Sequence, residues 1–580
     1  GAVHDPANVD GQGALPRGGI ALGEGDHGHR LGAGDAGVVH EDVDLAIAET
    51  AASPLDRPHQ LFFTGDQIYG DEVAQPLLWG IGQLAPGLFG WSEPLDIESV
   101  ETLRDHLQPG NRQFLVERYA GMTASAQGNK QKTNSHLLMF SEYCTSYLFS
   151  WSECLWRLEF PAADRVGLVG KSARSWDRAV RQLAATAQSQ VAVRRALANV
   201  PTYMIFDDHD VSDDWNLNQA WCLRVFGKPL GRQVVRNALL AYAIFQGWGN
   251  TPEQFSLERP GHRLLAATEA WCQAGAKHPT ALVEIIQALG LPQIDPLTDL
   301  PQFRQEENCL VLDRPQNCLE WHYRIPAGAH ETIVLDTRTQ RGYPISGTLD
   351  APPQLLSPEA YRQQLLPMLQ AAEQENRSHP IALTLVVAPT NVFTLEILDL
   401  LHVLGQLQNK AFEIDIGDSW NLEGSSRSQL LQVLFRARQQ IIVLSGDIHF
   451  GAALRVDYWS ALTGDPLALP RSQQPPDACL VQLTASAICN SEPIAELLQT
   501  RLKSLFPERS RYWIGQQPHL TELEITPSLG RSLGWIWNRL IHRSRWQAHQ
   551  QTDRQSPQSP KPPAFWGYRS QWLRHQPTQS

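Results

Sequence analysis

The stretch LFFTGD, which runs from Leu61 to Asp66, decides the fold class of this 580-residue chain. Three apolar residues stop abruptly at Thr-Gly-Asp, a combination typical of a strand that ends in a turn. A short helical pattern at 45–52 precedes this run. We therefore expect a helix followed by a strand that is covered on both faces, with Asp66 at the carboxyl end of the strand.

The same order of helix, strand and polar cluster recurs twice along the chain. A helical stretch at 191–200 leads into the apolar run YMIF (203–206), which ends in DDHD (207–210). A helix pattern with leucines at i,i+4 spacing precedes the apolar run at 441–444, which ends in SGDIH (445–449). Each polar cluster therefore follows the carboxyl end of a predicted strand.

Short apolar runs at 333–335 and 381–387 continue the alternation of strands and helices. This alternation is typical of an α/β protein. Ligands of open α/β sheets bind beyond the carboxyl ends of the strands. We therefore expect the three polar clusters to form one site.

The side chains of these clusters favour a metal centre. The candidate ligands and catalytic groups are Asp66, Tyr69, Asp208, His209, Asp447 and His449. Gly-Asp after a strand is also a common turn, so the interpretation depends on the three clusters together. Buried carboxylates repel one another, and hard cations bound by oxygen ligands remove this cost. Two metal ions that share a carboxylate can clamp a phosphoryl group and activate water, so the residues predict phosphoester hydrolysis.

Three motifs resemble, in the same order, those of the alkaline phosphatase D (PhoD-like) branch of the calcineurin-like metallophosphoesterases. They are GDQIY (65–69), FDDHD (206–210) and SGDIH (445–449), and VLDTR (334–338) and DSW (418–420) add to the resemblance. The similarity spans about residues 45 to 490. It implies a hydrolase of phosphomonoesters, phosphodiesters or both, built as a four-layer αββα sandwich with two mixed sheets and helical insertions.

The resemblance also implies a role for each ligand. Asp66 would bridge two metal ions. Tyr69, as a phenolate that favours Fe³⁺, and His449 would bind the first ion. Asp208 and Asp447 stand where the wider superfamily has Asn and His, and their carboxylates suit Ca²⁺ or another divalent ion at the second position.

Further residues take supporting roles in the same resemblance. His209 would lie over the phosphate, where it stabilises transition-state charge or protonates the leaving oxygen. Five acids are expected to act behind the ligands: Asp71, Asp207, Asp210, Asp213 and Asp214.

One part of the family pattern is missing. The family's first strand ends in a metal ligand, a cysteine in this branch and Asp-x-His in the wider superfamily, and neither occurs before Asp66. Residues 20–22, followed by Asp26, His27 and His29, offer a stand-in with the wrong spacing. We therefore expect the first strand to be absent. A non-catalytic or truncated PhoD-like protein that acts as a binding or scaffold protein is the alternative hypothesis.

Composition divides the chain into three regions. Residues 1–44 are Gly-rich and lack apolar periodicity, so we expect them to be irregular. The metallophosphatase domain is predicted at 45–525, with helical insertions at about 72–200 and 216–330. Residues 526–580 form a Trp-rich tail with eight Lys or Arg against one Asp. An amphipathic helix at 529–546 is expected to pack on the domain, or over the active-site mouth as a lid, rather than on a membrane.

The overall charge and the apolar segments exclude other classes of protein. The net charge of −13 lacks the basic footprint of a nucleic-acid-binding protein, so we expect a small phosphoester substrate and no nucleic-acid partner, and protein partners stay open. No apolar segment is long enough to span a membrane, and residues 136–156 are interpreted as a buried helix.

Cysteine usage and the N-terminus bear on the compartment. The eight cysteines contain no CxxC pair and predict reduced, mostly buried thiols. No signal peptide is visible, so a cytoplasmic location is expected for the chain as it stands, and a lost leader remains an open alternative.

Overall fold

The computed structural model describes most of the chain between residues 20 and 573. The described residues are 20–23, 36–53, 55–97, 100, 103–122, 133–375, 381–394, 418–420, 426–447, 451–462, 475–485, 511–516, 522–525 and 565–573. They form an α/β protein with helices and several sheets, consistent with an α/β sandwich.

The first sheet carries two of the predicted polar clusters. Its three strands are parallel, in the order β1 (Ile20–Gly23), β2 (Gln60–Phe63) and β3 (Thr202–Met204). Helix α1 (Ala36–Glu49) lies between β1 and β2 in the sequence, and the long helix α5 (Gly170–Asn199) leads into β3. Because the strands are parallel, the turns after β2 and β3 lie at the same edge of the sheet.

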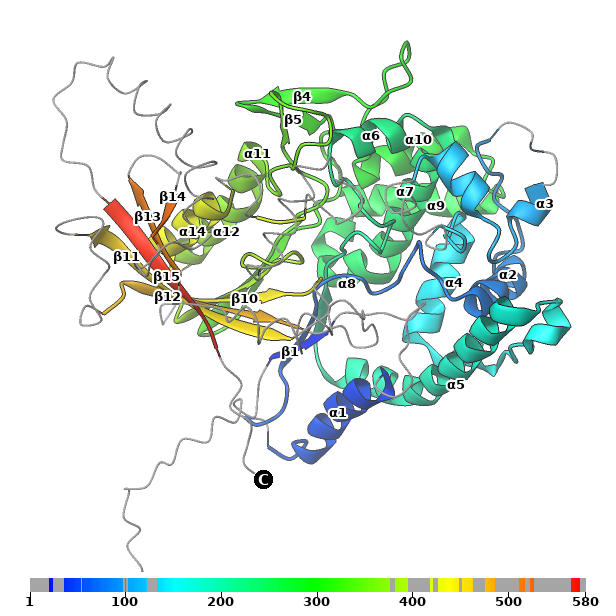
Figure 1. Cartoon of the computed structure of the whole chain (residues 1–580), viewed down its shortest axis with the longest axis horizontal. Helices are drawn as coiled ribbons and strands as arrows, with labels where there is room; N and C mark the ends of the chain where they lie inside the picture. The colour runs from blue at the N-terminus through cyan, green and yellow to red at the C-terminus, as the bar shows by residue number, and fades with distance from the viewer. Residues whose placement is uncertain are drawn as a thin grey trace, which may run out of the picture.

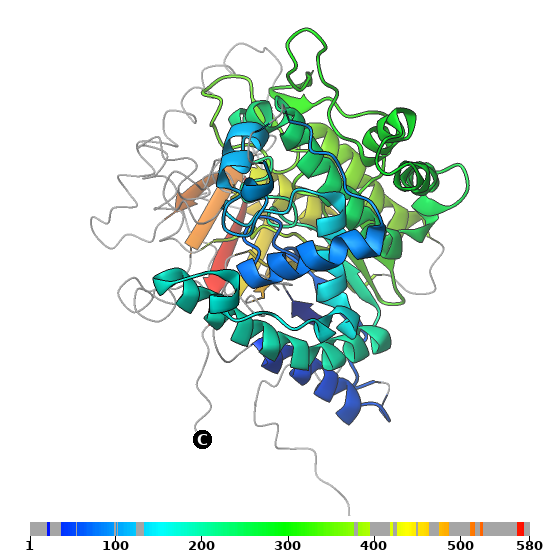
Figure 2. The same cartoon turned by 90° about the vertical axis from the view of Figure 1, so that its right-hand side faces the viewer.

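Alternate residues of β2 pack on opposite sides of this sheet. Leu61 and Phe63 pack in one apolar cluster with Ile47 of α1 and with Ala196 and Val200 at the end of α5. Phe62 belongs instead to the largest core cluster. Helices α1 and α5 lie side by side in both views, on one face of the sheet (Figures 1 and 2).

A nine-stranded mixed sheet carries the third cluster. Its order is β14 (Glu522–Ile525), β13 (Arg511–Gln516), β15 (Phe565–Trp572), β11 (Ala452–Leu462), β12 (Ala478–Thr484), β10 (Gln440–Ser445), β9 (Leu383–Val387), β7 (His330–Val334) and β6 (Tyr323–Pro326). Strands β7, β9, β10 and β12 are parallel to one another, and the remaining pairings are antiparallel.

The two faces of the nine-stranded sheet also pack in different clusters. Val386 and Val443 pack with residues of α12 (Leu366–Gln374) and α14 (Ser426–Ala437). Their neighbours Val387 and Leu444 belong to the same core cluster as Phe62 of the first sheet. The nine-stranded sheet therefore lies between this pair of helices and the core cluster that contains β2.

Helices build most of the largest core cluster. Between β2 and β3 these are α2 (Gln75–Phe89), α3 (Leu103–His106), η1 (Leu115–Ala120), α4 (Phe140–Trp151), η3 (Glu153–Arg157), η4 (Ala163–Val166) and α5. After β3 follow α6 (Gln219–Phe226), α7 (Pro229–Tyr242), η5 (Ala243–Gly247), α8 (Trp248–Asn250), η6 (Pro252–Phe255), α9 (Pro260–Gln273) and α10 (Pro279–Leu289). Helix α4 is almost wholly buried, as its sequence predicted. No described helix is long and apolar enough to cross a membrane.

A small antiparallel sheet and two short helices complete the elements. The sheet has the order β4 (Phe303–Glu306), β5 (Cys309–Leu312) and β8 (Tyr343–Pro344). Helix α11 (Pro358–Ala360) and the π-helix η7 (Tyr361–Leu365) run directly into α12. All seven cysteines in the described residues are free thiols, and three of them, Cys144, Cys222 and Cys309, are buried.

The structure differs from the sequence expectations in three regions. Residues 20–23 form β1, and α1 begins at Ala36, so 1–44 contain more than irregular chain. Residues 303–326 form strands of two sheets, so the second insertion is helical only as far as Leu289. Within the region expected to be a tail, β15 pairs with both β11 and β13. The predicted helix at 529–546 lies outside the described residues.

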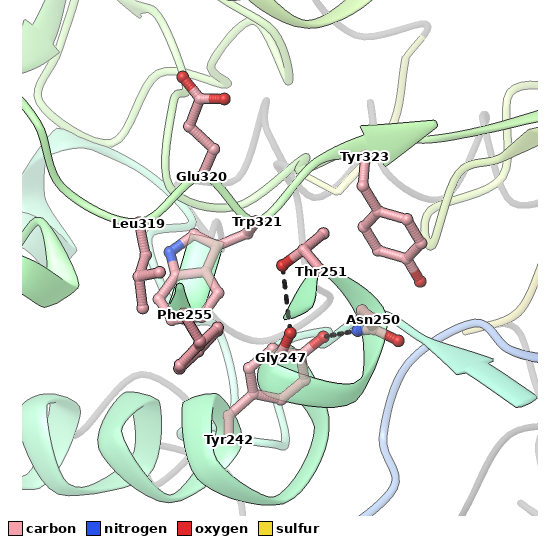
Figure 3. Close-up of a pocket in the computed structure, with 9 residues that line it drawn as sticks. All are labelled: Tyr242, Gly247, Asn250, Thr251, Phe255, Leu319, Glu320, Trp321 and Tyr323. Atoms are coloured by element: carbon pink, nitrogen blue, oxygen red, sulfur yellow. Dashed lines mark hydrogen bonds between the residues drawn. The ribbon is translucent and has the colours of Figure 1, made fainter. Parts of the chain in front are cut away.

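Side chains close the outer edge of β3 just before the second polar cluster. Asn250 pairs with the backbone of Met204 in the manner of a peptide group: its Oδ1 accepts from Met204 N at 3.0 Å, and its Nδ2 donates to Met204 O at 2.8 Å. The hydroxyls of Tyr242 and Tyr323 donate to the same carbonyl at 3.2 and 2.8 Å. Figure 3 shows these three side chains around a small hollow. They hold the end of β3 in place.

Candidate metal site

A glycine brings the loops after β2 and β3 into contact. Gly65 has a φ of 141°, and a Cβ atom there would lie 2.6 Å from Cβ of Asp207. Only glycine fits both the conformation and the space. The next residue, Asp66, has a φ of 53°, an uncommon conformation for a residue with a side chain. The turn thus directs Asp66 toward the loop that follows β3.

The carboxylate of Asp210 ties the same two loops together. Its Oδ2 accepts hydrogen bonds from the backbone N–H groups of Asp66 and Asp207, both at 2.9 Å, and its Oδ1 accepts from Ile68 at 3.4 Å. Burial raises the pKa of Asp210 to about 7, although the three N–H groups oppose this shift by favouring the charged form. Asp210 therefore holds the backbones of the two loops together.

Asp66, Asp208 and His209 converge. Each offers one ligand atom, and these atoms lie within 4.8 Å of one another. Asp66 is 3% exposed, and its Oδ1 has no hydrogen-bond partner among the described residues. Burial raises the pKa of Asp66 well above its usual value; His209 opposes the shift, and the neighbouring carboxylates add to it. A buried, unpartnered carboxylate oxygen next to a second carboxylate and an imidazole fits a hard or borderline metal cation.

A second group joins His209 to Asp71 and Asp213. Nδ1 of His209 lies 2.9 Å from Oδ2 and 3.1 Å from Oδ1 of Asp71, and Asp71 Oδ2 also accepts from the backbone N–H of Asp213 at 2.6 Å. The ring of Tyr69 stacks on the ring of His209, with centroids 4.2 Å apart. Burial opposes protonation of His209, but Asp71 and Asp208 outweigh it, so its pKa lies well above the usual value. The contacts with Asp71 and Tyr69 therefore fix the ring plane of His209, and the neighbouring carboxylates favour its protonated form.

Two buried arginines join the acids of the loop after β3 to Asp418. Arg338, which is fully buried, pairs with Asp207, with Asp208 at 3.2 Å and with Asp418 at 2.7 Å. Arg341 pairs with the other oxygen of Asp418. The two guanidinium groups hold the pKa of Asp418 below its usual value against the effect of burial. They balance part of the negative charge beside the cluster.

Arg338, Arg341 and Asp418 were not predicted as site residues, although VLDTR and DSW were noted as motifs. Only its position in the sequence could have indicated a role for Arg338, because it follows the carboxyl end of β7 as the acids follow the ends of their strands. Asp336 shapes this turn: its Oδ1 accepts from the backbone N–H groups of Arg338 and Thr339 at 3.0 and 2.8 Å.

Of the other predicted site residues, Asp447 and Asp214 belong to the part of the chain that the structure describes, and His449 does not. Asp447 follows β10 with a φ of 71°; burial first, and then Asp207 and Asp208, raise its pKa well above the usual value. Asp447 lies close enough to interact with these acids. Among the described residues, however, it belongs neither to the group around Asp66 nor to the group around Asp71. The backbone N–H of Asp214 donates to Asp208 Oδ2 at 3.2 Å. His449, Asp26, His27 and His29 lie outside the described residues.

Comparisons with known proteins add one structural likeness. No family model and no curated protein matches the chain. A solved structure titled "Structure of PhoD" aligns with 81% of this chain and 56% of its own, at 12% sequence identity and a TM-score of 0.32. The chain therefore spans little more than half the length of that protein. A likeness at this TM-score carries no information about the site.

Proposed function

We propose that the chain is a metal-dependent phosphoester hydrolase of the PhoD-like kind, with a four-layer αββα core, that acts on phosphomonoesters, phosphodiesters or both. The order of the motifs GDQIY, FDDHD and SGDIH supports this proposal. The observation that carries it is the convergence of Asp66, Asp208 and His209 within 4.8 Å, around a buried oxygen of Asp66 that no described group satisfies.

The proposed centre holds two metal ions. Asp66 would be shared, with Tyr69 and His449 holding an ion such as Fe³⁺ and Asp208 and Asp447 holding Ca²⁺ or another divalent ion. Bound metal ions in such a pair lower the pKa of water and stabilise the charge that develops on phosphate oxygens. The side chains of the protein supply the proton for the leaving oxygen.

His209 is the proposed acid of the reaction. Asp71 binds Nδ1 of His209, so Nε2 of His209 is the nitrogen that would donate a proton to the substrate. Neighbouring carboxylates raise the pKa of His209, which favours the protonated form that could donate a proton to the leaving oxygen. The stacked ring of Tyr69 restricts the rotation of the imidazole. Asp71 is therefore a positioning residue for His209.

Arg338 favours the second hypothesis, a non-catalytic binding or scaffold protein. Its guanidinium lies 3.2 Å from Asp208 and also pairs with Asp207, so part of the acidic charge is balanced without a metal ion. A descendant that had lost its metals would be stabilised by such a pairing, because like charges would otherwise repel one another in a buried site. Activity and metal content separate the two hypotheses.

The proposed activity is tested with a nitrophenyl phosphomonoester and a bis-nitrophenyl phosphodiester as substrates. Asp66→Asn is expected to lose at least about a hundredfold in turnover, the scale of removing one group that stabilises transition-state charge. Asp164→Asn, an exposed acid in a 3₁₀ turn, is the matched control and should retain full turnover. Equal turnover in Asp66→Asn and the control would overturn the proposal, as would no turnover of either ester by the unmodified chain supplied with metal ions.

A further inference from the structure

The N-terminal half of α5 carries a row of exposed basic side chains. Its members are Lys171, Arg174, Arg178 and Arg181, at spacings of three, four and three residues. Residues three or four positions apart lie on the same face of a helix, so the four side chains form one row. All four residues are exposed, and none of them forms an ion pair or a side-chain hydrogen bond with a described residue. We call this row the α5 basic stripe.

The basic residues in the C-terminal half of α5 have acidic partners instead. Arg194 lies 3.0 Å from Glu153 of η3, and Arg195 pairs with Asp44 of α1. Helix α1 packs against this half of α5. The N-terminal half of α5 extends past α1 at the periphery of the molecule (Figure 1). The α5 basic stripe is therefore the part of the helix whose cations no described acid neutralises.

The local charge is opposite in sign to the charge of the whole chain. Residues 164–185 contain five Lys or Arg and two Asp, whereas the chain has a net charge of −13. One of the two acids, Asp177, accepts a hydrogen bond from the backbone N–H of Ala163 at 2.9 Å. Like charges three or four residues apart on a helix repel one another and destabilise it. An anionic partner on this face would remove that cost.

The exposed side chains of this region favour a lipid surface over a nucleic acid. Trp176 is the only aromatic residue of α5, and it is 4% exposed, so the α5 basic stripe offers no ring for stacking on a base. The apolar residue Val169, directly before α5, is 82% exposed. A row of cations on a helix beside an exposed apolar side chain is typical of segments that lie on membranes with anionic lipids.

We propose that the α5 basic stripe binds the surface of an anionic phospholipid bilayer. The N-terminal half of the helix lies flat on the bilayer, and its three guanidinium groups and one ammonium group bind lipid phosphates. Guanidinium groups suit this role because each can donate two parallel hydrogen bonds to a phosphate. Val169 contacts the boundary between headgroups and acyl chains. This surface shares no residue with the candidate metal site, and its test needs no enzymatic activity.

The test is co-sedimentation of the full chain with lipid vesicles at millimolar lipid. One set of vesicles is equimolar phosphatidylglycerol and phosphatidylcholine, and the other is phosphatidylcholine alone. We expect the chain to bind the anionic vesicles and not the neutral ones, and added salt to release it because salt screens exposed charges. Equal binding to both sets of vesicles, or binding to neither at low salt, would overturn the proposal.

Two fourfold variants locate the binding. The first removes the α5 basic stripe through Lys171→Gln, Arg174→Gln, Arg178→Gln and Arg181→Gln. Because each basic residue near an anionic surface strengthens binding about fivefold, this variant should bind at least about a hundredfold more weakly. The control removes four exposed basic residues that lie elsewhere and also have no described ion-pair partner, through Arg104→Gln, Arg118→Gln, Arg259→Gln and Lys277→Gln. It should retain most of the binding.

The outcomes of these variants separate the α5 basic stripe from other surfaces and other partners. Both variants change only exposed side chains, so both should fold, which circular dichroism checks. Equal binding of the two variants to the anionic vesicles would contradict the assignment to α5. Binding of duplex DNA that only the stripe variant loses, without binding to the vesicles, would assign the stripe to nucleic acid and overturn the lipid proposal.

Discussion

Side chains that would bind neither a metal ion nor the substrate set the geometry of the candidate metal site. Asp210 uses both carboxylate oxygens to hold the backbone of the two loops that carry Asp66 and Asp208. Arg338 joins the second of these loops to Asp418. The positions of the candidate ligands therefore depend on a network of buried acids and arginines, which keeps them close in spite of their mutual repulsion.

Gly65 is a residue where the two loops come into close contact, and Gly65→Ala tests that contact. The positive φ and the 2.6 Å approach to Asp207 predict a loss of about 1–3 kcal/mol in the free energy of unfolding. Gly82→Ala is the matched control: Gly82 lies in α2 with open space around it, and alanine there should stabilise the helix by about 0.5–1 kcal/mol. Urea unfolding measures both changes, and a neutral effect of Gly65→Ala would contradict the packing described here.

The pH dependence of turnover tests the pairing of Asp71 with His209. Removing the Asp71 charge in Asp71→Asn lowers the pKa of His209, so the alkaline limb of the turnover profile should move to lower pH by at least about one unit. The sign follows from the proposed role, because His209 donates its proton only below its pKa. Asp164→Asn serves as the control. A profile that does not move in Asp71→Asn would remove His209 from the role of acid.

The sequence was sufficient to predict that Asp66, Asp208 and His209 lie close together, because each stands within three residues of the end of an apolar run. It was not sufficient for Arg338, whose partners Asp207 and Asp418 lie 131 and 80 residues away. An arginine after a strand has no distinguishing local pattern. Its function emerges only when the strand ends meet in the folded chain.

At the scale of elements, the residues of the candidate site follow the ends of strands that belong to two sheets. The turns after β2 and β3 belong to the first sheet, whereas Asp447 and Arg338 follow β10 and β7 of the nine-stranded sheet. Phe62 of the first sheet and Leu444 of the second share one core cluster. Packing of the two sheets therefore governs how closely the acids and arginines approach.

Strand β15 is the element whose removal best tests the arrangement of the nine-stranded sheet. It pairs with β11 on one side and β13 on the other, and its Tyr568 is 1% exposed. A chain that ends before residue 565 should show faster amide hydrogen exchange throughout β11, because that strand loses half of its backbone partners. A chain that ends after residue 573 is the control. Equal exchange rates in the two truncated chains would contradict the pairing.

For the whole molecule, local patterns predicted the α/β class but not all of its parts. Strands β2, β9 and β10 are apolar runs covered on both faces, which a sequence reveals directly. Strand β15 contains Arg569, Ser570 and Gln571 and pairs with residues about a hundred positions away, so no local pattern distinguished it from a tail. The short strand β1 lies in a Gly-rich stretch and pairs with β2, so the local sequence did not reveal it either. Long-range pairing decides such strands.

The central claim, that the converged acids and His209 form a metal centre, is tested most directly by elemental analysis of the full chain. The account predicts two tightly held metal ions per chain, with iron and calcium or another divalent ion present. It also predicts that Asp66→Asn reduces this content and that Asp164→Asn leaves it unchanged. A chain that holds no metal ion, and binds none when iron, calcium and manganese are added, would contradict the account and favour the non-catalytic alternative.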